Sequence, residues 1–184
     1  LLFVLKAHKA NPDEKIFVGH TRSFSIVVEH IARLHDNHGG LIWVDGPTGS
    51  GITSFLKHIR LFSKRQSFFA SYNQGRTYKE SAYQGLRALF ESLPEALQAQ
   101  IYAPDPPSKW MLFAKIRDEL VSRGPSVIIL DNIHLSDSGT VELVSYLIRN
   151  TLSERHAPIL FLIGTHTEMD SSEINGILTG QSTN

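Results

Sequence analysis

The chain contains no cysteine, no long apolar run and no net charge, and each absence argues against a class of protein. Without cysteine among its 184 residues, it can form neither disulfides nor thiolate zinc sites. Its longest apolar stretches, such as 126–130 and 158–163, fall short of the about 18 residues of a transmembrane helix, so we expect no membrane partner. Lys and Arg number 18 and so do Asp and Glu, and this balance gives no signal of direct nucleic-acid binding.

The amino terminus also lacks features of an exported or complete protein. The sequence begins at Leu1 rather than at methionine, and no secretory signal pattern follows. Together with the absence of cysteine, this predicts a cytoplasmic location. We expect the chain to be a piece of a longer polypeptide, whose partners are the other domains of that parent chain and further proteins.

Four short apolar runs alternate with helical patterns along the chain. The runs cover residues 41–46, 67–73, 126–132 and 159–166. They do not alternate with polar residues, which is typical of strands buried on both faces of a parallel sheet. Apolar residues at helical spacing predict helices within 22–40, 53–62, 81–93, 108–124 and 136–152. This order predicts an α/β fold with a central parallel sheet and helices on both faces.

The stretch DGPTGSGITSF, residues 45–55, matches a phosphate-binding loop at every fixed position but one. The pattern is G-x-x-x-x-G-K-[ST], and Ile52 stands where the lysine is required. The stretch follows a predicted strand and opens a predicted helix, as this motif demands. We therefore predict that the phosphates of a nucleotide contact Gly46, Pro47, Thr48, Gly49, Ser50, Gly51, Ile52 and Thr53.

Loss of the lysine weakens such a loop without abolishing it. Backbone N–H groups and the start of the following helix hold an anion without any side chain. A charged hydrogen bond is worth about 1.5–3 kcal/mol, so its absence costs about ten- to a hundredfold in affinity. Ile52 also cannot neutralise charge during phosphoryl transfer. We predict weak binding of ATP or ADP; a strand-to-helix turn that keeps its glycines without a ligand is the alternative.

A second polar signal follows the strand at 126–132. Asp131 ends its apolar run, where such a carboxylate holds Mg²⁺ beside the loop. We predict Thr53 and Asp131 as the Mg²⁺ ligands. The next residue, Asn132, cannot accept a proton from water at neutral pH, so we assign no catalytic residue. Asp137 is predicted to cap the amino terminus of the next helix.

The ordered motifs FVGH, DGPTGSGITSF, LDNIHLSD and GTHT resemble those of STAND-type signalling ATPases. These are relatives of AAA+ proteins and of Orc1/Cdc6-like modules, and the resemblance covers about residues 15–168. It implies a three-layer P-loop NTPase core with the C-terminal lid missing, and an adenine nucleotide between the loop and the 17–20 segment, where Val18 and Gly19 are the expected contacts. Departures from the family's motifs fall at the polar positions His20, Ile52, Asn132 and Thr167.

The resemblance also implies how the chain is divided and used. Residues 1–14 are expected to be an N-terminal extension, 15–168 a P-loop NTPase-like domain, and 169–184 a polar tail leading to an absent lid or further domains. Polar positions altered within an intact apolar frame predict a degenerate, regulatory nucleotide-binding domain with little or no hydrolysis. Two alternatives stay open: an interaction module independent of nucleotide, in which Ile52 fills the pocket, and an ATPase completed by a partner domain.

Overall fold

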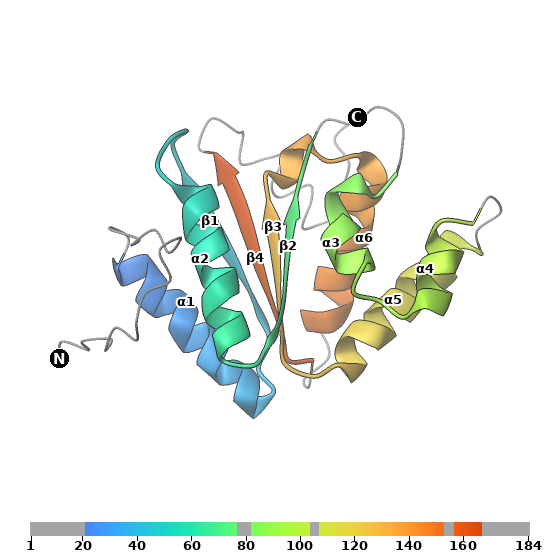
Figure 1. The fold of residues 1–184 in the computed structure, drawn as a ribbon, viewed down its shortest axis with the longest axis horizontal. Coiled ribbons are helices and arrows are strands. Elements are labelled where there is room, and N and C mark those ends of the chain that lie inside the picture. The colour runs from blue at the N-terminus through green and yellow to red at the C-terminus, as the bar shows by residue number, and fades with distance from the viewer. Residues whose placement is uncertain (1–20, 77–81, 104–106, 153–156, 167–184) are drawn as a thin grey trace.

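A four-stranded parallel sheet forms the centre of the molecule (Figure 1). The computed structural model describes residues 21–76, 82–103, 107–152 and 157–166. The strands run in the spatial order β1-β4-β3-β2, and every neighbouring pair is parallel. Their bounds are Gly40–Gly46 for β1, Phe69–Gln74 for β2, Ser126–Asp131 for β3 and Ile159–His166 for β4. The four predicted strands are confirmed, with ends displaced by no more than two residues.

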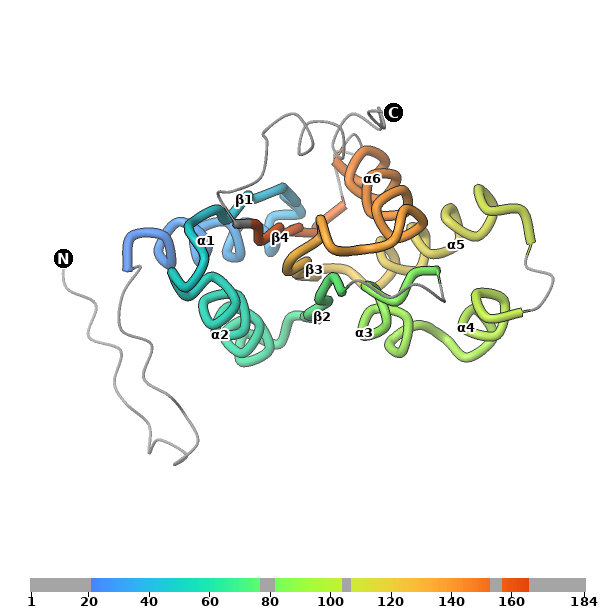
Figure 2. The backbone as a smooth tube through the Cα atoms, turned by 90° about the horizontal axis from the view of Figure 1, so that it is seen from above, coloured from blue at the N-terminus to red at the C-terminus, as the bar shows by residue number. Residues whose placement is uncertain are grey.

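Helices cover both faces of this sheet, as predicted (Figure 2). One face carries α1 (Thr21–Arg33) and α2 (Ile52–Arg65). The other face carries α3 (Arg87–Phe90), α4 (Glu95–Ile101), α5 (Lys109–Ser122) and α6 (Ser138–Leu152). Alternate residues of β3 serve the two apolar cores, so Val127 faces α2 whereas Ile128 faces the larger helical layer. Within the described ranges, no helix has the length and apolar character needed to span a bilayer.

The segment after β2 differs from the helix predicted over 81–93. In place of one long helix, a 3₁₀ turn at Gln84–Leu86 leads into the single turn of α3, and α4 begins separately after Pro94. Tyr83 has a left-handed backbone with φ of 65°, which a continuing right-handed helix cannot contain. Apolar spacing alone did not reveal this break.

Asp137 caps the amino terminus of α6, which confirms the prediction for this residue. Its Oδ1 accepts hydrogen bonds from the N–H of Thr140 at 2.8 Å and the N–H of Tyr83 at 3.0 Å. Its Oδ2 accepts the hydroxyl of Thr140 at 2.6 Å. Burial raises the pKa of Asp137, but these hydrogen bonds outweigh it and hold the pKa below its ordinary value. The cap therefore joins the turn before α3 to α6.

We expect Asp137→Ala to lower the free energy of unfolding by about 1 kcal/mol or more at pH 7, the typical cost of losing a helix cap. The carboxyl group has a lower pKa in the folded than in the unfolded state. Its contribution is therefore complete above the unfolded value of about 4 and lost as pH falls through the folded value. Urea unfolding at pH 7 and at pH 3 measures both effects.

Asp118→Ala is the control, because Asp118 is exposed and, within the described part of the chain, pairs with the adjacent Arg117 alone. We expect this change to stay within about 0.5 kcal/mol. A deficit for Asp137→Ala that is as large at pH 3 as at pH 7 would show that the carboxylate's charge is not what stabilises the cap.

Candidate functional site

The loop between β1 and α2 has the strand-turn-helix course that its motif requires. Gly49 and Gly51 take left-handed backbone conformations, with φ of 84° and 91°, which glycine adopts without strain. The N–H of Ser50 donates to the carbonyl of Pro47 at 3.0 Å and closes a turn. The helix α2 begins at Ile52 directly after the second of these glycines. The backbone features of a phosphate-binding loop are therefore present.

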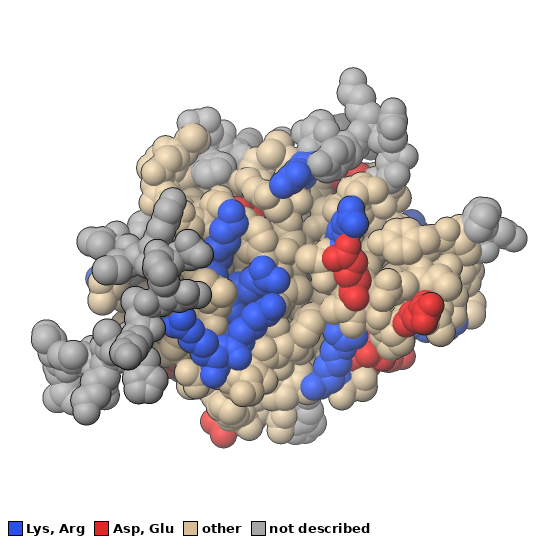
Figure 3. Space-filling view, in the orientation of Figure 1, with Lys and Arg blue, Asp and Glu red and all other residues tan. Residues whose placement is uncertain are grey.

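The helix that follows the loop carries basic but no acidic side chains. The first turn of α2 contains no acidic residue, so the partial positive charge of its amino terminus is not neutralised from within that turn. The same helix carries Lys57, Arg60, Lys64 and Arg65 and no Asp or Glu along its length. Lys and Arg side chains accordingly gather over α2 on one face of the molecule (Figure 3). Such a face raises the local concentration of anions.

Ile52, at the position of the missing lysine, is turned into the core. Its side chain is 4% exposed and belongs to the apolar cluster beneath α1 and α2. Its Cδ1 lies 3.4 Å from where a Cβ on Gly46 would be, and its Cγ2 lies 3.2 Å from the corresponding position on Gly164. The isoleucine thus fills space between the base of the loop and β4.

The two predicted Mg²⁺ ligands lie side by side. The Thr53 hydroxyl donates to Asp131 Oδ2 at 2.8 Å, although 78 residues separate them. The Asp131 side chain is 1% exposed, and its Oδ1 has no hydrogen-bond partner among the described residues. This contact follows from the fold, because the carboxyl ends of parallel strands meet at one edge of the sheet, beside the start of α2.

A third residue, Tyr72, contacts this pair and was not predicted from the sequence. Its hydroxyl donates to the same Oδ2 of Asp131 at 2.5 Å. Burial raises the pKa of Tyr72, and the hydrogen bond to Asp131 and the charge of that carboxylate raise it further. Tyr72 pairs with Ile129, two residues before Asp131, so both face the same side of the sheet. Only the register of β2 against β3 indicates that Tyr72 lies near Asp131.

Asn132 has a structural reason for its identity. Its backbone is left-handed, with φ of 53° and ψ of 42°, a conformation that asparagine tolerates better than most residues. Its N–H donates to the carbonyl of Gly164 at 3.0 Å, which turns the chain away from β3. Its Oδ1 is buried and has no hydrogen-bond partner among the described residues. The residue therefore shapes the turn that follows Asp131.

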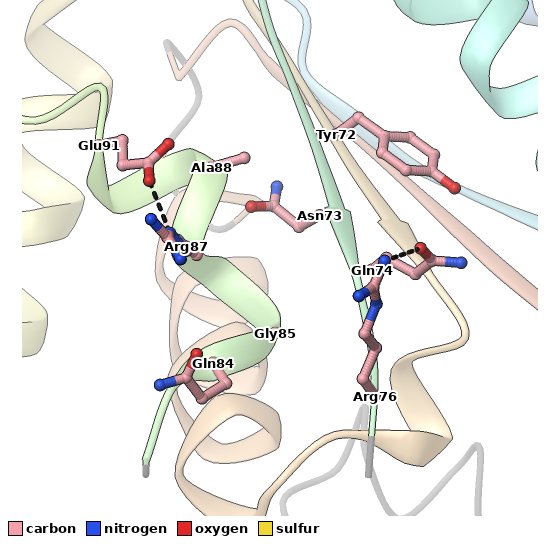
Figure 4. A pocket seen from close by; sticks show the side chains of 9 residues that line it. All are labelled: Tyr72, Asn73, Gln74, Arg76, Gln84, Gly85, Arg87, Ala88 and Glu91. Atoms are coloured by element: carbon pink, nitrogen blue, oxygen red, sulfur yellow. Dashed lines mark hydrogen bonds and ion pairs between the residues drawn. The ribbon is translucent and has the colours of Figure 1, made fainter. Parts of the chain in front are cut away.

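Other predicted residues fall elsewhere. Val18, Gly19, His20 and Thr167 lie outside the described residues. A hollow of about 360 Å³ opens between β2 and α3, lined by Asn73, Gln74, Arg76, Arg87, Glu91 and neighbouring residues (Figure 4). In that view Asn73 points toward α3 and Tyr72 points to the opposite side of β2. This hollow is therefore separate from the phosphate-binding loop.

A profile described as "AAA domain" matches residues 35–171, which include the loop, α2 and the tip of β3. The chain belongs to this AAA domain family. It is an AAA-type nucleotide-binding domain on a P-loop NTPase fold, and ATP or ADP with Mg²⁺ is the ligand typical of the family. A comparison with curated protein sequences gave no match.

A solved structure with a TM-score above 0.5 shares the fold of this AAA domain at low sequence identity, and a second is similar below that score. The Aeropyrum pernix ORC2 protein, solved as ADPNP-ADP complexes, is 15% identical, with a TM-score of 0.51 over 87% of this chain and 44% of its own. C. elegans PCH-2 is also 15% identical, with a TM-score of 0.45 over 87% of this chain and 42% of its own. The chain thus spans less than half the length of either protein.

We expect Thr53→Val to lower the free energy of unfolding by about 1.5–3 kcal/mol, because it removes a hydrogen bond to a charged acceptor and leaves the shape of the side chain. Urea unfolding measures the change. The neighbouring Ser54→Ala is the control, since Ser54 is exposed on the same helix turn. Equal stability of the two variants would mean that the Thr53–Asp131 contact contributes nothing to folding.

Proposed function

We propose that this AAA domain is a regulatory nucleotide-binding domain of a larger signalling protein. It binds ATP or ADP weakly together with Mg²⁺ and hydrolyses ATP little or not at all. The contact of Thr53 with Asp131 at 2.8 Å carries the proposal, because it brings both predicted metal ligands to the start of α2. The proposed output is a change in how the domain contacts the rest of its parent chain or protein partners.

The residues present fit a nucleotide with its metal. The glycine-containing loop and the first turn of α2 offer backbone N–H groups to phosphate oxygens. Thr53 and Asp131 offer the hydroxyl and carboxylate oxygens that Mg²⁺ prefers. Bound Mg²⁺ would neutralise phosphate charge, and Val18 and Gly19 are proposed to contact the nucleoside.

The same residues argue against efficient hydrolysis. Ile52 places a buried apolar side chain where a phosphoryl-transfer enzyme needs a cation. Asn132, next to Asp131, cannot take a proton from the attacking water. Two separate contributions to the reaction are therefore absent from this chain, whereas the backbone contribution to binding is retained.

The burial of Ile52 also favours a second candidate function. With 4% of its side chain exposed, it packs between Gly46 and Gly164 as an ordinary core residue would. On this reading the loop is a structural turn, and the domain acts as a protein-interaction module without nucleotide. The two functions differ in whether phosphate can still enter the loop.

Titration of the chain with ATP in the presence of Mg²⁺, followed by calorimetry, tests the proposed function. We expect measurable binding at millimolar nucleotide, and weaker binding when Mg²⁺ is removed with EDTA. Absence of heat and of any thermal stabilisation at millimolar nucleotide would reject nucleotide binding in favour of the interaction module.

We expect Ile52→Lys to tighten ATP binding by about ten- to a hundredfold, because it restores a charged hydrogen bond to the phosphates. Leu61→Lys is the control, since Leu61 is 50% exposed on the same helix. This substitution adds an equal charge away from the loop. Circular dichroism confirms that both variants are folded. An unchanged affinity in a folded Ile52→Lys variant would show that the loop does not admit phosphate.

A further inference from the structure

The hydrogen bonds at the Asp131 carboxylate are unevenly distributed. Oδ2 accepts two hydroxyl groups, from Thr53 at 2.8 Å and from Tyr72 at 2.5 Å. Oδ1 accepts none from the described residues and is buried. It lies 3.2 Å from the position that a Cβ on Gly164 would take, the same distance as Cγ2 of Ile52. Oδ2 therefore accepts two hydroxyl groups, whereas Oδ1 is buried and accepts no hydrogen bond from the described residues.

Tyr72 reaches this oxygen from the edge strand of the sheet. It stands on β2 opposite Ile129, and its ring extends along the sheet toward the tip of β3. Lys57 Nζ lies 5.6 Å from the centre of the ring. Lys57 is one turn after Thr53 on α2, so residues of the same helix face contact both the ring of Tyr72 and its hydrogen-bond acceptor. The tyrosine is thereby held in place from two sides.

We propose that Tyr72 controls metal binding at this site, because its hydroxyl occupies the acceptor position on Asp131 that a metal-bound water needs. The inference rests on the metal site of the proposed function. It adds that the domain, as folded, holds this site in a state of low metal affinity, which opens when Tyr72 releases Asp131.

The number of hydrogen bonds that each carboxylate oxygen can accept supports this inference. Each carboxylate oxygen accepts about two hydrogen bonds, and Thr53 with Tyr72 supply two to Oδ2. Mg²⁺ keeps several of its waters in proteins and contacts carboxylates through them. Thr53 can offer an oxygen lone pair to the metal while its O–H still donates to Asp131 Oδ2. The hydroxyl of Tyr72 fills the second acceptor position of Oδ2, so it must leave before a metal-bound water can donate to that oxygen.

The surroundings keep Tyr72 in its role as a donor. A tyrosine hydroxyl has one proton to donate, and Asp131 Oδ2 accepts it. Oδ1 offers no exposed alternative acceptor to a water, because it is buried. The tyrosine and the metal-bound water therefore compete for one oxygen.

Binding of Mn²⁺ alone, measured by electron paramagnetic resonance on the full chain, tests the inference without nucleotide. Mn²⁺ suits the same oxygen ligands as Mg²⁺. We expect Tyr72→Phe to bind Mn²⁺ about tenfold more tightly than the unaltered chain, the effect of removing one competing hydrogen bond to a charged acceptor. Tyr146→Phe is the matched control, because Tyr146 is also half-buried but lies on α6, away from Asp131.

The double variant Tyr72→Phe with Asp131→Asn should lose the gain, since the gain requires the carboxylate. Mn²⁺ affinity of Tyr72→Phe that is unchanged, weakened or undetectable would overturn the inference. A second measurement uses the unaltered chain, in case Tyr72→Phe does not fold. Saturating Mn²⁺ should alter the ultraviolet difference spectrum of tyrosine, and the absence of any change would also overturn it.

These outcomes are separable from failure of the proposed function. Titration with ATP in EDTA reports on the loop and the start of α2 without the metal. A chain that binds no nucleotide but gains Mn²⁺ affinity in Tyr72→Phe would retain the inference and lose the proposed function. If the chain binds ATP while Tyr72→Phe leaves Mn²⁺ binding unchanged, the proposed function is retained and the inference is lost.

Discussion

The hydrogen bond between Thr53 and Asp131 is the interaction on which the candidate site depends. It connects the start of α2 to the end of β3 across 78 residues of sequence, and it exists because β1 and β3 run parallel with β4 between them. In this arrangement the loop after β1 and the tip of β3 must open at the same edge of the sheet. The position of the site is thus a property of the topology.

In the proposed function, a phosphate-binding loop holds phosphate through its backbone N–H groups and through a cationic side chain. In this loop the backbone groups are present without the cation. Its backbone contribution comes from Gly49, Gly51 and the amino end of α2, and it needs no particular side chain elsewhere. Its side-chain contribution would come from position 52, where Ile52 is buried instead. The backbone contribution depends on loop conformation, whereas the side-chain contribution depends on which residue occupies position 52. A sequence can therefore lose the cationic side chain and keep the loop conformation.

Much of this architecture was predictable from the sequence, and the exceptions have physical causes. Buried parallel strands are recognisable because their apolar runs are continuous, and the spacing of the loop motif identified Thr53. The break at Tyr83 was missed because a left-handed residue leaves no mark in apolar periodicity. Tyr72 was missed because its contact with Asp131 depends on the register of β2 against β3, which a single sequence does not fix. Residues 1–20 and 167–184 carry expectations that lie outside the described structure.

Gly164 on β4 has a consequence for how this domain can diverge. A methyl group at this position would lie 2.5 Å from Leu56 Cδ1, 3.2 Å from Asp131 Oδ1 and 3.2 Å from Ile52 Cγ2. Two elements, α2 and β3, therefore approach this strand position closely because it has no side chain. A side chain at 164 would therefore have to be accommodated by changes at Leu56 and Ile52, which occupy the volume that it would need.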